Sequence, residues 1–285
     1  MTLEKVSEYR CFWGLQQRFK HRSESLGCDM HFSLYLPPQV GERKVPLIYW
    51  LSGLTCTDEN FVIKAGAQRY AAEHGIALLA PDTSPRGDDV PDDAEGAYDF
   101  GLGAGFYVNA TQEPWSKHYR MYDYVVEELP ALTRESFELD HSNTAIMGHS
   151  MGGHGALTIA LRNPETYRSV SAFSPIVSPS TVPWGTKALG NYLGPDESLW
   201  AEHDSCALIR AGGKQVPMLV DQGLDDDFFE EQLKTKLLEQ ACEAADYNAT
   251  IRYQPGYDHS YFFIASFIGS HIAFHAQALG NYNRM

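Results

Sequence analysis

The feature that most constrains the fold is a series of short, continuous apolar segments separated by longer segments with helical periodicity. A strand covered by helices on both faces needs apolar side chains at every position, whereas a strand with one face in water alternates. The continuous segments are 46–52, 76–80, 144–147, 170–173 and 218–220. The pattern predicts an α/β fold in which these segments are the inner strands of a mostly parallel sheet.

Two further strands and several helices complete this prediction. Residues 30–36 alternate apolar and polar side chains, which predicts a half-buried antiparallel strand near one edge of the sheet. Residues 250–254 form a last strand. Gly and Pro near the ends of the periodic segments mark helix boundaries, and Pro130 allows an earlier end of the second helix. The expected helices are 61–74, 119–133, 151–162, 228–244 and 261–278.

No Pro- or Ser-rich linker and no internal repeat divides the 285 residues. Single α/β domains often reach about 250 residues, so we expect one domain over 1–285. Residues 84–117 and 174–215 fit no helix or strand. Because long irregular segments of a compact domain are usually functional, we expect both to be lid-like insertions that roof the active site.

The charge balance excludes several functions. The chain has 22 basic and 37 acidic residues, a formal net charge of −15, which repels phosphate backbones and anionic membranes. We therefore expect no nucleic acid or membrane partner. No run of about 18 apolar residues occurs, and charges interrupt the N-terminal segment where a signal peptide needs an apolar core. Five cysteines without a C-x-x-C pair indicate reduced thiols of a cytoplasmic protein.

Residues 148–152 read Gly-His-Ser-Met-Gly and match the G-x-S-x-G pattern where a predicted strand meets a predicted helix. Flanking glycines let the chain turn sharply, so that the Ser150 hydroxyl projects above the sheet. The N-terminus of the helix then lies beneath developing negative charge. The bare pattern also arises by chance, but its position between strand and helix makes Ser150 the candidate nucleophile.

A serine hydroxyl is a weak nucleophile unless a base removes its proton and an acid holds that base in the right tautomer. In the α/β-hydrolase fold the order along the chain is serine, acid, histidine. Of the five histidines that follow the serine, His259 lies in the loop after the last predicted strand, where the fold carries its base. His154 is expected to cap or line the site, and His203 lies in the second irregular segment. His271 and His275 are one turn apart on the last helix, where a solvated or packed face is more usual than a metal site.

The acid is sought in 221–227, which follows a predicted strand and contains four aspartates. Such a cluster also serves turns, helix caps or weak cation sites. Asp221 is too close to the strand to reach over its end. Asp227 and Glu230 fit a capping box for the next helix, which leaves Asp226 as first choice and Asp225 as second.

Acyl transfer also needs backbone N–H donors around the oxyanion. One donor comes from the residue after the nucleophile, here Met151. The second is expected from an earlier loop between a strand and a helix. Residues 50–57 supply such a loop, in which Gly53 allows close approach of the backbone and the Leu54 N–H is placed to donate.

Five longer motifs go beyond a generic hydrolase. They are YWLSGLTCTDENF from Tyr49, APDTSPRG from Ala80, DFGLGAGFYVNAT from Asp99, GHSMGGHGAL from Gly148 and PGYDHSYFFIASFI from Pro255. Together they closely resemble the S-formylglutathione hydrolase (esterase D) family, in register over about residues 11–278. The resemblance implies a cytoplasmic, usually dimeric α/β-hydrolase without cofactor or metal. It also implies cleavage of S-formylglutathione to formate and glutathione in formaldehyde detoxification.

Matched position by position, the resemblance implies Ser150 as nucleophile, His259 as base and Asp226 as acid, and so resolves the choice that spacing leaves open. It assigns the oxyanion donors to Leu54 and Met151. Leu224 and Asp227 depart from the family pattern, where many relatives carry a polar pair.

The resemblance also indicates the surroundings of the site. The loop tryptophan Trp184 is expected to wall the acyl or glutathione pocket, with Cys56 and His149 as further pocket candidates. Lys64, Arg86 and Lys187 are candidates for binding glutathione carboxylates, although each is equally consistent with an ordinary surface charge. Two other functions remain open: a general small-acyl carboxylesterase, and a non-catalytic binding protein with a hydrolase fold.

Overall fold

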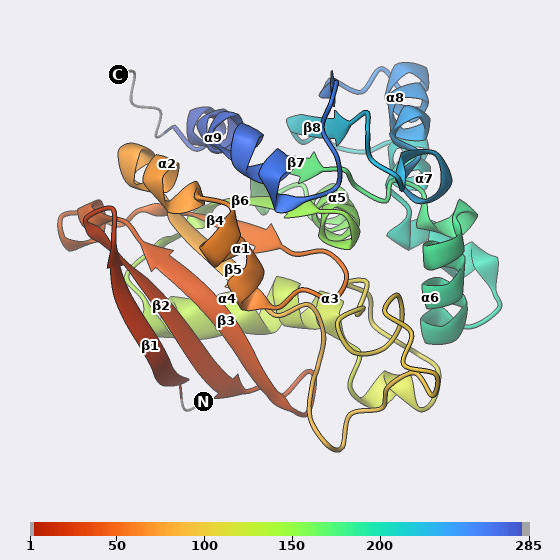
Figure 1. The fold of residues 1–285 in the computed structure, drawn as a ribbon, viewed down its shortest axis with the longest axis horizontal. Helices are drawn as coiled ribbons and strands as arrows, with labels where there is room; N and C mark the ends of the chain where they lie inside the picture. The colour runs from red at the N-terminus through yellow and green to blue at the C-terminus, as the bar shows by residue number, and fades with distance from the viewer. Residues whose placement is uncertain (1–2, 281–285) are drawn as a thin grey trace.

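One sheet of nine strands forms the centre of the computed structural model, which describes residues 3–280 (Figure 1). Its strand order is β1-β2-β3-β5-β4-β6-β7-β8-β9. Following this spatial order, neighbouring strands from β1 to β5 are antiparallel, and neighbouring strands from β5 through β4 to β9 are parallel. The strands are β1 (Leu3–Cys11), β2 (Gly14–Arg22), β3 (Asp29–Leu36), β4 (Pro46–Leu51), β5 (Ala77–Pro81), β6 (Asp140–His149), β7 (Tyr167–Phe173), β8 (Met218–Gly223) and β9 (Ala249–Gln254).

Helices cover both faces of the parallel part of this sheet. They are α1 (Asp58–Lys64), α2 (Ala67–His74), α3 (Met121–Asp123), α4 (Leu129–Ser136), α5 (Met151–Arg162), α6 (Pro183–Leu193), α7 (Ser205–Ala211), α8 (Thr235–Ala244) and α9 (Tyr261–Ala278). The predicted α/β-hydrolase fold, with a mostly parallel sheet between helices, is confirmed. No helix within residues 3–280 combines the length and the apolar character that crossing a membrane requires.

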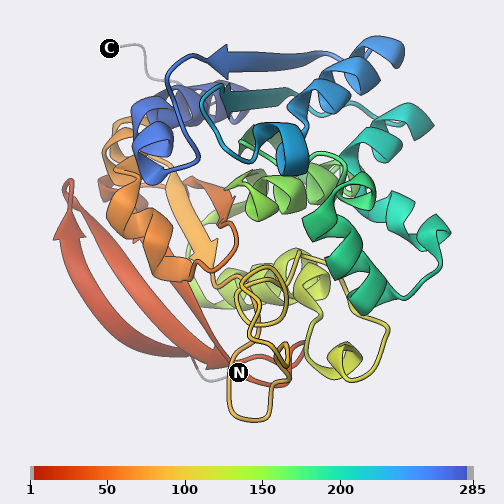
Figure 2. The same cartoon turned by 45° about the vertical axis from the view of Figure 1, so that its right-hand side comes forward.

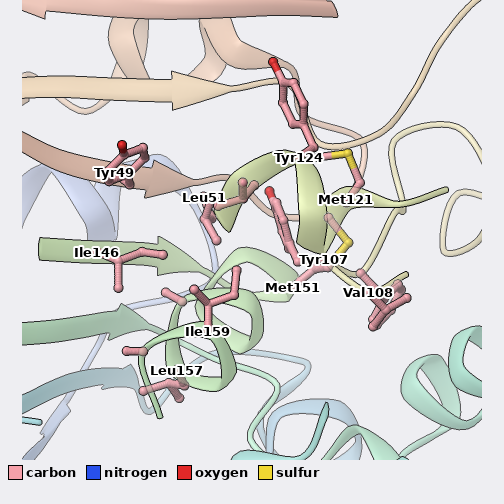
Figure 3. Packing of buried hydrophobic residues seen from close by; sticks show 14 of the residues in the cluster. Tyr49, Leu51, Tyr107, Val108, Met121, Tyr124, Ile146, Met151, Leu157 and Ile159 are labelled. Carbon is pink, nitrogen blue, oxygen red and sulfur yellow. The ribbon is translucent and has the colours of Figure 1, made fainter. Parts of the chain in front are cut away.

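Successive side chains of a strand point alternately into the two helical layers, and for this reason the inner strands are apolar at every position. On β4, Tyr49 and Leu51 belong to the buried cluster that also contains Met151 and Ile159 of α5 (Figure 3). Ile48 and Trp50 face the opposite layer, which is formed by α1, α2 and α9. The Trp50 ring stacks on Phe61 of α1, with ring centroids 4.0 Å apart. Both faces of the strand are therefore fully buried.

The hairpin of β1 and β2 was not predicted. These strands lie outside β3, so the antiparallel strand predicted near one edge at 30–36 is the third strand from that edge. The β1 sequence LEKVSEYRC has no fully buried position, because only one neighbour pairs with it and water covers most of its surface. Without a buried face, the strand carries no apolar alternation from which it could be recognised.

Three of the predicted helices are interrupted. The segment 61–74 is two helices, α1 and α2, separated at Gly66, which has a left-handed φ of 66°. In 119–133, a π-helical turn over Tyr124–Glu128 joins α3 to α4. Pro130 does not end the helix, because it lies in the first turn of α4, where a missing N–H is tolerated. In 228–244, a π-helical turn over Phe229–Leu233 precedes α8.

The two segments expected to be irregular differ from one another. Residues 84–117 contain one short 3₁₀ helix, Trp115–Lys117, and otherwise form the yellow loops of Figure 2. Residues 174–215 instead contain α6 and α7, so the expectation was wrong for this segment. Pro183 occupies the first turn of α6, and Gly194, with φ of 89°, ends it. Here Pro and Gly act as helix boundaries and not as signs of a loop.

Candidate active site

The turn between β6 and α5 presents Ser150 at the carboxyl ends of the parallel strands. Ser150 has φ of 57° and ψ of −118°, a conformation that costs on the order of 1–3 kcal/mol for a residue other than glycine. Its N–H donates to the Phe173 carbonyl of β7 at 2.9 Å and so helps to hold the turn in place. A Cβ at Gly152 would lie 2.0 Å from the Leu51 carbonyl oxygen. Only glycine therefore allows α5 to begin so close to β4.

Asp226 and His259 lie in the loops that follow β8 and β9. The His259 Nδ1 atom is 2.6 Å from Asp226 Oδ2, although 33 positions separate the two residues in the chain. The Asp226 side chain is fully buried, whereas one fifth of the His259 side chain is exposed. Nδ1 is therefore occupied by Asp226, and the ring borders the same cavity as Ser150.

The predicted capping box of Asp227 and Glu230 was wrong. Asp226 itself accepts the Phe228 N–H at 3.0 Å through Oδ1, while Oδ2 meets His259. Asp225 and Asp227 are exposed, and the Asp225 N–H donates to the Tyr257 carbonyl at 3.0 Å. The Asp226 carboxylate thus stabilises its own loop and also positions His259. Sequence spacing alone does not reveal that one side chain makes both contacts.

A cavity of about 350 Å³ joins the candidate residues. Its wall includes Ser150 and His259, the predicted oxyanion donor Leu54, and the predicted pocket residues Cys56, His149 and Trp184. Tyr98, from the segment 84–117, and Trp184, from the segment 174–215, contribute one aromatic side chain each. The Trp184 Nε1–H donates to the Tyr98 hydroxyl at 3.1 Å, so the two segments meet at the wall of the cavity.

Leu54 and Met151 come from two different segments of the chain that meet beside the nucleophile. Leu54 follows β4, and Met151 is the first residue of α5. Among residues 3–280, neither of their backbone N–H groups donates to a protein acceptor. A Cβ on the neighbouring Gly53 would lie 3.1 Å from Ser150 Cβ, which shows how closely this loop approaches the serine. Two free N–H donors beside a serine and at a helix N-terminus can stabilise an oxyanion.

The walls contain aromatic residues that the sequence reasoning missed: Tyr98, Phe228 and Tyr261. Phe228 packs against the catalytic candidate His259, with ring centroids 5.1 Å apart, and against Trp184 at 4.8 Å. Phe228 and Tyr261 each lie two residues from a candidate catalytic residue, which is the signal that could have identified them. Tyr98 lies in an irregular segment and carries no comparable signal.

His149 and Cys56 are uncharged parts of the wall. The His149 ring lies 4.4 Å from the His259 ring, and neither of its nitrogens has a hydrogen-bond partner among the described residues. Burial lowers the pKa of His149 well below its usual value, so the ring is neutral. Burial also raises the pKa of the Cys56 thiol, which keeps it protonated and therefore a poor nucleophile.

The other histidines do not reach the cavity. His154, expected to cap or line the site, is buried, with Nε2 3.0 Å from the Phe106 carbonyl oxygen. Burial lowers its pKa to about 4. His203 is also buried, and burial lowers its pKa to about 3. His271 and His275 form a buried hydrogen-bonded chain with Ser171. No group of three or more metal-binding side chains occurs in residues 3–280.

Comparisons with known proteins agree with this geometry. Residues 23–274 match the Esterase family model. An S-formylglutathione hydrolase from Agrobacterium tumefaciens is 47% identical, with 97% of this chain and 99% of that chain covered and a TM-score of 0.95. An S-formylglutathione hydrolase from Staphylococcus aureus is 17% identical, with 97% and 100% covered and a TM-score of 0.70. The latter similarity concerns the fold alone.

Proposed function

The chain belongs to the S-formylglutathione hydrolase family of esterases, and we propose that it hydrolyses S-formylglutathione to formate and glutathione through a Ser150–His259–Asp226 triad. The observation that carries this proposal is the meeting of three loops at one cavity. Ser150 and His259 line that cavity, and Asp226 binds the far side of the His259 ring at 2.6 Å. The reaction needs no cofactor, because the chain itself supplies nucleophile, base, acid and oxyanion donors.

In the first half-reaction, His259 Nε2 takes the Ser150 proton while Oγ attacks the formyl carbon. The carbonyl oxygen becomes an oxyanion, which accepts hydrogen bonds from the Leu54 and Met151 N–H groups. The C–S bond then breaks, the departing sulfur takes the proton from His259, and a formyl ester remains on Ser150. Because a thiol has a pKa of about 8.5, it leaves with less help from an acid than an amine requires.

In the second half-reaction, water attacks the formyl ester as His259 removes its proton. The bond between the formyl carbon and Ser150 Oγ breaks, formate leaves, and Oγ recovers the proton from His259. Asp226 accepts the Nδ1–H throughout, so that Nε2 faces the reacting atoms and the imidazolium is stabilised. The neutral His149 ring, beside His259, adds no competing charge.

Replacement of Ser150 by alanine tests the mechanism. We expect turnover of S-formylglutathione to fall by about four to six orders of magnitude, because removing one triad member removes the covalent route. The variant should unfold at the same urea concentration as the parent, because Ser150 is held through its backbone. Substantial residual turnover by a folded Ser150→Ala protein would reject the serine mechanism.

Substrate comparison separates the alternatives. Steady-state assays on S-formylglutathione, S-acetylglutathione and p-nitrophenyl acetate should give the highest kcat/KM with S-formylglutathione. A general small-acyl carboxylesterase would instead prefer the ester or show no preference. A non-catalytic binding protein would turn over none of the three, and the presence of every triad element at one cavity argues against it.

Three broader properties belong to the same proposal. Residues 1–285 form one catalytic domain, because a single sheet carries the loops of Ser150, Asp226 and His259. All five cysteines are free, as is usual in a reducing compartment such as the cytoplasm. The protein is a homodimer, which sedimentation equilibrium would test directly.

A further inference from the structure

The three cations considered for carboxylate binding have different surroundings. Arg86 is engaged by Asp82 at 2.9 Å through Nε and at 3.1 Å through Nη2. Lys187 Nζ lies 2.6 Å from Asp99 Oδ1. Neither of these two residues lines the cavity. Their charges are therefore largely neutralised by protein carboxylates and are not presented to a ligand at the nucleophile.

Lys64 is different. It is the last residue of α1, and among residues 3–280 it is the one lysine or arginine that lines the cavity. Its ammonium group lies 5.6 Å from the centre of the Tyr261 ring, which is also part of the wall. Among the ion pairs of residues 3–280, none involves Lys64.

The acidic residues on the same helix do not neutralise Lys64, because they face Arg18. Arg18 Nε lies 2.9 Å from Asp58 Oδ2, and Arg18 Nη1 lies 3.3 Å from Glu59 Oε2. Asp58 is fully buried in this contact and also accepts the Ser33 hydroxyl at 2.8 Å. The charges of α1 are thus divided, with the carboxylates turned to the sheet and the ammonium at the cavity.

Asn60 lies one helical turn before Lys64 and also lines the cavity. Its Oδ1 atom accepts the Thr57 N–H at 2.9 Å in a capping box, which fixes the orientation of the amide. The amide NH₂ group has no acceptor among residues 3–280, so it remains available to a ligand. Residues four apart on a helix lie on the same face, and both Asn60 and Lys64 line the cavity.

No aspartate or glutamate of the described residues lines this cavity, although the chain carries a net charge of −15. We propose that Lys64, assisted by the Asn60 amide, binds a carboxylate of the thiol half of the substrate. This assignment rests on the proposed function and explains how an acidic protein accepts an anionic thioester. A strong charge-assisted hydrogen bond at the cavity compensates for long-range repulsion.

The subsite predicts selectivity between two formyl thioesters. S-formylglutathione carries carboxylates, whereas S-formyl-N-acetylcysteamine has the same acyl group and a neutral thiol. In Lys64→Met we expect KM for S-formylglutathione to rise about tenfold with little change in kcat, because one charge-assisted hydrogen bond is lost. The kinetic constants for the neutral thioester should stay within twofold. Lys64→Arg should retain most of the affinity.

Lys44→Met is the matched control. Lys44 is paired with Glu138 at 3.0 Å and precedes β4, at the end of the sheet opposite the nucleophile. The Lys44→Met substitution removes the same positive charge from the chain, so it reports any effect of the electrostatic field of the whole protein. Both thioesters should be hydrolysed by Lys44→Met as by the parent. An equal rise in KM in both lysine variants would overturn the local subsite.

Inhibition separates this assignment from the proposed function. S-methylglutathione carries the carboxylates but no acyl group, so it reports binding while a neutral ester reports turnover. Its inhibition constant should rise about tenfold in Lys64→Met. An unchanged constant, or an equal loss with the neutral thioester, would overturn the role of Lys64. Failure of the parent enzyme to hydrolyse S-formylglutathione, with this inhibition intact, would overturn only the proposed function.

Discussion

Two pairs of aspartate and histidine lie at the end of the sheet that carries the nucleophile, and they have different surroundings. Asp226 and His259 are 2.6 Å apart, and Asp221 and His271 are 3.0 Å apart. Both aspartates come from β8 or the loop after it, and both histidines follow β9. The His259 ring is partly exposed at the cavity, whereas the His271 ring is fully buried.

The second pair continues into a chain of hydrogen bonds. His271 Nδ1 lies 2.8 Å from the Ser171 hydroxyl, which lies 2.8 Å from His275 Nε2. His275 Nδ1 lies 2.7 Å from the Ser169 hydroxyl. If His271 Nε2 donates to Asp221, His271 Nδ1 accepts the Ser171 hydroxyl proton. Ser171 then accepts from His275 Nε2, and His275 Nδ1 accepts from the Ser169 hydroxyl. In this arrangement both histidines are neutral.

The pKa values agree with this arrangement. Burial lowers the pKa of His271 and lowers that of His275 well below its usual value. Burial by itself would raise the Asp221 pKa, but hydrogen bonds from His271 and Arg252 outweigh it and hold the pKa at about 2. The two pairs therefore differ in whether the histidine ring borders the cavity or is enclosed in the core, and under the proposed mechanism only the first pair takes part in chemistry.

The largest effect that would separate the two pairs is expected for Asp226→Asn. Asparagine can still accept the Phe228 N–H, but it no longer holds His259 in the productive tautomer or stabilises the imidazolium. We expect kcat to fall by about four orders of magnitude, with little change in the urea midpoint. Asp225→Asn, on the exposed neighbour, is the control and should change neither. A normal rate for Asp226→Asn would remove the distinction between the pairs.

Asp221→Ala is expected to have the opposite profile. It leaves the buried His271 nitrogen and part of the Arg252 guanidinium without their acceptor, so the free energy of unfolding should fall by about 3 kcal/mol. Below the unfolding transition, kcat should stay within a few fold of the parent. Urea unfolding and steady-state rates on the same preparation check both statements. A loss of kcat as large as that of Asp226→Asn would place Asp221 in the catalytic machinery.

Lowering the pH should gradually destabilise the folded protein through the buried hydrogen-bonded residues Asp221, His271 and His275. The folded pKa values of His271 and His275 lie below the ordinary 6.5, so between these values the unfolded protein binds more protons. Their contribution to stability is complete above pH 6.5 and is lost as the pH falls. Asp221, at about 2 against 3.8, loses its contribution between those two values. Thermal midpoints should fall on acidification, and His275→Gln should make that fall shallower below pH 6.5.

Local patterns predicted much of the fold and part of the site. The bounds of α5 and α9 coincide with the predicted 151–162 and 261–278, because apolar periodicity and flanking turn residues lie within those segments. The predicted inner strands were found for the same reason. The hairpin of β1 and β2 was missed because its exposed strand has no such pattern.

Side-chain partners were harder to predict, since they depend on residues far apart in the chain. Asp99 and Lys187 are 88 positions apart, and because they form an ion pair, the Lys187 charge is not available to a ligand. Asp221 and His271 are 50 positions apart, and neither residue alone indicates a buried chain. Phe228 belongs to the cavity wall because its loop folds over His259.

By itself, the sequence determined the α/β layering, the candidate nucleophile in its turn, and the loop that holds His259. Each depends on a short segment whose periodicity or turn residues decide its conformation. The tertiary structure decided which of two Asp–His pairs meets the cavity, which aspartate both caps a loop and binds His259, and which lysine stays unpaired there. These outcomes follow from burial and electrostatic pairing between distant segments, and both arise only when the sheet brings those segments together.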